Sequence, residues 1–163
     1  MKDEMQAFLI GTNMKKISNK KIKRLNDLLI MNYEAEKIYL EALDIVTDDN
    51  LKTFFRERGF ERNEYGKQLR TEIKALGGEP KHLEGLSNEY HKIWTNFRNI
   101  LKEGDETELL YEVCYIKQLS IDKYDELLHI HRLPISLCKT LVDQRDNIQS
   151  AMNLIRVNKR LVA

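Results

Sequence analysis

Lys117 is the one charged residue in an otherwise apolar or small helical stripe. The stripe belongs to a helix predicted over Leu109–Leu128. Three- and four-residue steps place its members on one helix face: Leu110, Val113, Lys117, Ser120 or Ile121, Tyr124 and Leu127. Burying an ammonium without a partner is costly, so we expect an acidic group to face Lys117.

Two glutamates hold comparable central positions in other predicted helices. Glu36 lies halfway along the inner stripe of a helix predicted over Asn19–Val46, and Glu61 lies at the middle of the stripe over Asn50–Leu76. At matching levels, Glu36, Glu61 and Lys117 would form a buried polar cluster, as an ion pair or triad. Carboxylates from facing helices are also the ligands that iron and manganese take in helical bundles.

Composition excludes several other classes of protein. The chain has 163 residues, a net charge of +1, and only 7 Gly and 2 Pro, which leaves little turn chemistry for an all-β or Rossmann-type fold. Cys114 and Cys138 form no CxxC pair, and we expect buried free thiols in a reducing compartment. No signal peptide or membrane-length apolar run is visible, so we expect a cytoplasmic protein.

The order of predicted helices indicates an all-α fold. Gly77-Gly78 ends the second helix, a crossover with a shorter helix follows, and Pro134 opens the last helix. We therefore expect a ferritin-like up-down-down-up four-helix bundle with an extra short helix in the crossover. Residues 1–21 would form a basic N-terminal arm or short helix, and residues 22–163 the bundle.

Several segments in order resemble a bacterial ferritin-like family of unknown function, the YciF-type stress-associated four-helix bundles. The matching pieces are LNDLL at 25–29, Glu36 followed by LEAL at 40–43, LKTFFRE at 51–57, LGGEP at 76–80, His91 with Trp94, the GD pair at 104–105, and Tyr124. The resemblance covers roughly residues 22–160 and implies a carboxylate-bridged two-metal protein.

The family's ligand positions are only partly filled here. Glu36 matches the carboxylate of the first helix, and Glu61, with Glu64, matches the second-helix region. The glutamate of the central helix falls on Lys117. The last helix carries Met152 in place of the histidine and Asn147 in place of the neighbouring acid. Because a lysine repels a cation and offers no acceptor while protonated, the resemblance implies a degenerate, metal-free site.

These observations predict a non-catalytic structural or interaction protein. We expect a homo-oligomer without catalytic residues or cofactor, stress-associated by resemblance. One alternative is a two-metal iron or manganese oxidase or ferroxidase with unusual ligands, on Glu36, Glu61 and Glu64. Another is a nucleic-acid-associated bundle that uses a basic segment: Lys15, Lys16, Lys20, Lys21, Lys23 and Arg24.

Overall fold

Helices account for nearly all of the regular structure. The computed structural model describes residues 2–161, with side chains from residue 19 onward. Within these residues there is no strand, and the helices are α1 (Lys2–Ile45), α2 (Asp49–Ala75), α3 (Asn88–Glu103), α4 (Glu106–Leu128) and α5 (Ile135–Asn158). The all-α prediction is confirmed. Across the described residues, no helix combines the length and apolar character needed to cross a membrane.

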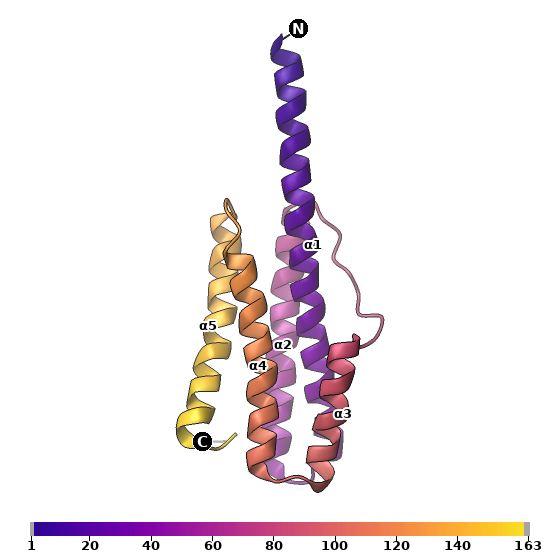
Figure 1. Cartoon of the computed structure of the whole chain (residues 1–163), viewed down its shortest axis with the longest axis vertical. Helices are drawn as coiled ribbons and strands as arrows, with labels where there is room; N and C mark the ends of the chain where they lie inside the picture. The colour runs from indigo at the N-terminus through magenta and orange to yellow at the C-terminus, as the bar shows by residue number, and fades with distance from the viewer. Residues whose placement is uncertain (1, 162–163) are drawn as a thin grey trace.

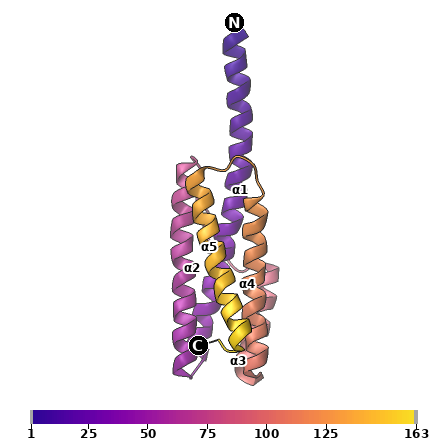
Figure 2. The ribbon, with the colours of Figure 1, turned by 90° about the vertical axis from the view of Figure 1, so that its left-hand side faces the viewer.

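Four long helices lie side by side (Figures 1 and 2). The most extensive packing joins α1 to α2 and α4 to α5, while α3 bridges α1 and α4. From the N-terminus, α1 and α5 run in one direction, and α2 and α4 run in the other (Figure 1). The first turns of α1 extend past the ends of the other helices in both views.

Side-chain caps fix where three helices begin. Asp48 accepts a hydrogen bond from the Leu51 backbone N–H, and Asp105 accepts one from the Glu108 backbone N–H. Ser87 caps α3 by accepting a hydrogen bond from the Tyr90 backbone N–H. Each cap satisfies a backbone donor that has no partner within its helix.

The end of α2 follows the predicted glycine pair. Gly77 adopts a φ of 80°, a left-handed conformation that costs glycine little. The Gly78 N–H donates to the Ile73 carbonyl and the Gly77 N–H to the Lys74 carbonyl. These two bonds define a Schellman motif, which stops the helix and turns the chain into the crossover.

Two polar side chains of α1 anchor the crossover. Asn26 donates to the Glu79 carbonyl and accepts from the Lys81 N–H, at 3.1 and 2.9 Å. Glu34, which is buried, accepts from both the N–H and the hydroxyl of Ser87, each at 2.8 Å. The start of α3 is thereby fixed against α1.

Some predicted boundaries differ from the observed ones. α1 begins at Lys2, not near Asn19, so the expected division between residues 21 and 22 falls inside one helix. α5 begins at Ile135, with Pro134 in the cap position just outside the helix instead of at its first residue. The side chains of residues 1–18, which make up most of the expected basic arm, lie outside the described residues.

Close packing between α1 and α2 rotates both inner faces from those predicted. A Cβ on Gly59 would lie 2.7 Å from Leu40 Cδ2, and a Cβ on Gly66 would lie 2.9 Å from Tyr33 Cε1. The two glycines, seven residues apart, therefore let the helices approach closely. On α1 this buries Ala35 instead of Glu36, which is only half-buried.

Candidate functional site: a cationic polar core

A chain of hydrogen bonds crosses the middle of the bundle. Asn32 on α1 donates to the Tyr124 hydroxyl on α4 at 3.1 Å. Tyr124 in turn donates to Gln144 on α5, and Gln144 donates to Gln68 on α2 at 2.8 Å. Asn32, Tyr124 and Gln144 are almost fully buried. All four long helices therefore contribute to one polar layer.

Arg62 enters this layer from α2. Its side chain is 1% exposed, and its Nη1 donates to Asn32 Oδ1 at 3.1 Å. The Nη2 atom is buried without a hydrogen-bond partner in the described residues. A guanidinium remains protonated at all ordinary pH values, so Arg62 places a permanent positive charge in the core.

Lys117 adds a second buried amine, from α4. Its side chain is also 1% exposed, in agreement with the predicted inward position. Burial, reinforced by the positive charges of Arg62 and Arg58, lowers its pKa to about 7, while Glu61 and Cys114 act in the opposite direction. Within the described residues, Lys117 has no carboxylate oxygen within 4.0 Å. It is a buried amine near its titration point at neutral pH.

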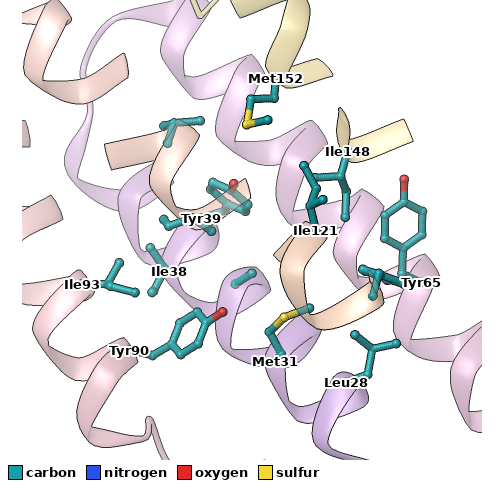
Figure 3. Close-up of a cluster of buried hydrophobic side chains, with 14 of the residues drawn as sticks. Leu28, Met31, Ile38, Tyr39, Tyr65, Tyr90, Ile93, Ile121, Ile148 and Met152 are labelled. Carbon is teal, nitrogen blue, oxygen red and sulfur yellow. The ribbon is translucent and has the colours of Figure 1, made fainter. Parts of the chain in front are cut away.

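Two phenols, Tyr39 and Tyr90, are also buried in the core. Tyr39, Ile121, Ile148 and Met152 lie in the interior between the helices, and the ring of Tyr90 reaches inward from α3 (Figure 3). The hydroxyls of Tyr39 and Tyr90 have no hydrogen-bond partner among the described residues. Burial raises the pKa of both phenols, and the charge of Arg62 opposes that shift, so the hydroxyls remain protonated donors.

The two glutamates expected beside Lys117 have other partners. Glu36 is half-buried and accepts a hydrogen bond from Asn63 at 3.0 Å, and burial raises its carboxyl pKa. Glu61 is paired with Arg58 at 3.4 Å, on the flank of α2. In the structure, each of these two carboxylates has a closer partner than Lys117. A single cluster of Glu36, Glu61 and Lys117 stays a prediction.

The alternative ligand set is not assembled in the structure. Glu64 is paired with Lys67 at 3.1 Å at the surface. On α5, Met152 is buried and Asn147 is exposed. Among the residues with described side chains, no three His, Cys, Asp or Glu gather closely enough to hold a metal ion, so Glu36, Glu61 and Glu64 do not form such a group.

Arg62 is the central residue that the sequence analysis missed. The predicted α2 stripe had Glu61 at its middle, but Glu61 is only half-buried. The observed stripe is as regular in spacing: Phe55, Gly59, Arg62, Gly66, Leu69 and Ile73. This stripe has a low hydrophobicity because it contains two glycines and an arginine. The two glycines, seven residues apart inside a helix, were the signal that could have indicated close helix packing.

The basic segment is only partly available to a partner. Lys21 is 9% exposed and donates to the Arg132 carbonyl at 2.9 Å, across the loop between α4 and α5. Lys23 is paired with Asp27 at 3.4 Å. Lys20 and Arg24 line a shallow hollow that also holds Glu126. The side chains of Lys15 and Lys16 are outside the described residues.

Both cysteines are free and half-buried, less deeply placed than the sequence analysis expected. Cys114 lies on α4 in a mainly apolar hollow that α5 shares with it. Burial raises its thiol pKa, so the thiol is protonated and of low reactivity at neutral pH.

The fold and the core define a class of all-α proteins with a positively charged polar centre. The chain belongs to the family described as a domain of unknown function, DUF2383, whose model matches residues 20–130. This match takes in α2, α3 and α4 with most of α1, and it includes Asn32, Arg62 and Lys117.

Two known proteins are similar in sequence to a shorter part of the chain. The chain is 32% identical over 107 residues to the chaperone protein HtpG of Rickettsia typhi and, to the same extent, to that of Rickettsia prowazekii. The likeness covers 57% of this chain but only 17% of each HtpG. No solved structure is significantly similar to the chain.

Proposed function

We propose that this protein is a non-catalytic helical bundle with a structural or interaction role, whose two-metal site has been lost. One observation carries the proposal: Arg62 and Lys117 occupy the centre of the bundle, each 1% exposed. A di-iron or di-manganese centre needs several carboxylates and imidazoles to offset the charge of its cations. Two buried cationic residues would instead repel a metal ion at that position.

A ferritin-like up-down-down-up arrangement is part of the proposal. The helix directions support it, because α1 and α5 run opposite to α2 and α4, and α3 lies in the connection between the two pairs (Figure 1). The ordered resemblance to YciF-type stress-associated bundles over roughly residues 22–160 supports both this arrangement and a stress-linked role. The two free cysteines favour a cytoplasmic location.

The interaction role, including self-association, is supported by apolar side chains on the outside of α4 and α5. Tyr111 and Tyr115 on α4 are 75% and 48% exposed. Between these helices lies an apolar hollow lined in part by Leu110, Tyr115 and Ile155. Exposed apolar groups that gather around a hollow are typical of protein-binding surfaces. The partial likeness to a chaperone is in keeping with such a role.

An iron-oxidation assay tests the non-catalytic part of this proposal. Ferrous iron would be added in air at neutral pH, and ferric products followed by absorbance, with and without the protein. We expect the protein to leave the rate of oxidation unchanged. A rate that saturates with iron and scales with protein concentration would contradict the proposal and favour the oxidase alternative. Glu36→Gln and Glu61→Gln, separately and together, would then test the proposed ligands.

A further inference from the structure

Several buried groups that can donate hydrogen bonds lie in the interior of the bundle without a partner among the described residues. Arg62 Nη2, the Tyr39 hydroxyl and the Tyr90 hydroxyl are buried without partners in the described residues. Lys117 adds an amine that is 1% exposed. We propose that these groups, from α1, α2, α3 and α4, bind a small monovalent inorganic anion such as chloride in the core.

Charge is the first argument for an anion. Two carboxylates of α1 and α2 are engaged with other groups: Glu61 with Arg58 at 3.4 Å, and Glu34 with Ser87 at 2.8 Å. No ion pair within the described residues includes Arg62 or Lys117. Lysine can lose its proton on burial, but arginine keeps its charge, so Arg62 in particular calls for a counter-charge.

Hydrogen bonding is the second argument. The guanidinium has five N–H donors, and within the described residues Arg62 donates one hydrogen bond, to Asn32 Oδ1. Helix geometry brings these groups to neighbouring levels of the bundle. Asn32, which accepts from Arg62, is hydrogen-bonded to Tyr124. Tyr39 lies two turns from Asn32 on α1, and Lys117 lies two turns from Tyr124 on the antiparallel α4, toward the same end of the bundle. A water molecule would satisfy some of these donors and leave the charge uncompensated. An anion would accept hydrogen bonds from these donors and also compensate the positive charge. Its negative charge would favour the protonated form of Lys117.

An anion site in the core does not depend on what the bundle binds at its surface, and so it is separate from the proposed function. It assigns to the bundle centre a ligand of the opposite charge from a metal ion. A monovalent ion is the fitting class because Arg62 supplies one permanent charge and Lys117 is a titrating neighbour.

Linkage between anion binding and unfolding provides the first test. Urea unfolding of the full chain would be measured at constant ionic strength while sodium chloride replaces sodium gluconate. A single site predicts that the unfolding equilibrium constant falls about tenfold for each tenfold rise in chloride above the dissociation constant. We expect this slope in the parent protein. Arg56→Met removes an exposed arginine of the same helix and should leave the slope intact.

Arg62→Met should abolish the chloride dependence. Lys117→Met, which keeps Arg62, should weaken the binding of chloride while leaving a measurable slope. If the parent shows no dependence beyond the background shared by Arg62→Met, the proposal is overturned. Because Arg62→Met alters the core and could fail to fold, a second measurement uses the unmodified protein.

Crystals of the parent grown or soaked in sodium bromide provide that measurement. We expect an anomalous bromide peak inside the bundle, within hydrogen-bonding distance of Arg62 Nη2 and close to Lys117 Nζ. Bromide peaks confined to the protein surface, with ordered water beside Arg62, would overturn the proposal regardless of how the variants behave.

Discussion

Arg62 and Lys117 show that this core is specified by polar contacts as well as by apolar packing. Buried ionic groups rarely add stability over apolar residues of the same shape, because removing them from water costs about as much as they regain. Their geometry is nevertheless demanding. Asn32 must accept from Arg62 while donating to Tyr124, so the relative heights of α1, α2 and α4 are fixed by one amide.

Tyr124→Phe tests that hydrogen-bond chain. The change removes one hydroxyl and leaves Gln144 Oε1 and one Asn32 donor without this partner. We expect a loss of about 1–3 kcal/mol in the free energy of unfolding, measured by urea denaturation. Tyr111→Phe, on the exposed face of the same helix, should change stability by less than about 0.5 kcal/mol. Equal effects of the two substitutions would show that the chain contributes nothing to stability.

Lys117→Met should remove a pH dependence of stability in gluconate buffer. The pKa of Lys117 is about 7 in the folded protein, against 10.5 for an ordinary lysine. Between these values the unfolded chain binds more protons, so the stability of the parent should rise with pH from 7 towards 10.5. Each pKa unit corresponds to about 1.4 kcal/mol, which makes the full rise on the order of a few kcal/mol.

Urea midpoints of parent and variant at pH 6, 8 and 9.5 provide the check. The variant should be the more stable of the two at pH 6, and the difference should shrink at higher pH. Lys67→Met, at an exposed position of α2, serves as the control. A variant that tracks the parent at every pH would show that Lys117 reaches water and titrates normally.

The sequence predicted some of these residues and missed others for a physical reason. The inward position of Lys117 is confirmed. Arg62 was missed because helical periodicity alone does not distinguish adjacent stripes when polar residues occupy both. The approach of α1 to α2 at Gly59 and Gly66, a tertiary effect, decides between them.

At the scale of single helices, local chemistry predicted most of the ends. The Ser87 cap of α3 and the glycine stop of α2 follow from backbone rules that need no tertiary information. The start of α1 was predicted near Asn19 but lies at Lys2, because residues 2–18 contain no proline and one glycine does not by itself end a helix.

Gly77→Ala tests the stop signal of α2. An L-residue at a φ of 80° is strained, and we expect a loss of roughly 1–2 kcal/mol in unfolding free energy. Gly85→Ala is the matched control: it lies in the same crossover, with no positive φ and nothing within 4 Å of the added Cβ. The free energies of unfolding of both variants would be measured by chemical denaturation. Indistinguishable stabilities would show that the left-handed turn can relax without cost.

At the scale of the whole molecule, the N-terminal end of α1 is the distinctive feature. It extends beyond the rest of the bundle (Figure 1), and its sequence includes the apolar run Phe8-Leu9-Ile10. The family model begins at residue 20 and so excludes it. We infer that this extension contributes to self-association and not to the folding of the bundle.

Deleting residues 2–18 tests this inference. We expect the helicity per residue, measured by circular dichroism, to remain nearly unchanged. The mass measured by light scattering should fall. A truncated chain that unfolds would show instead that the extension belongs to the core. One that folds and keeps the parent's mass would place the self-association surface elsewhere, for example on the exposed face of α4 and α5.

The measurement that bears most directly on the central claim is elemental analysis of this 163-residue chain, purified without chelator from cells supplied with iron and manganese. A bundle centre formed by Arg62 and Lys117 should repel divalent cations, so we expect far less than one iron, manganese or zinc per chain. Two equivalents of metal per chain, lost in Glu36→Gln or Glu61→Gln, would contradict the account and restore the metal site.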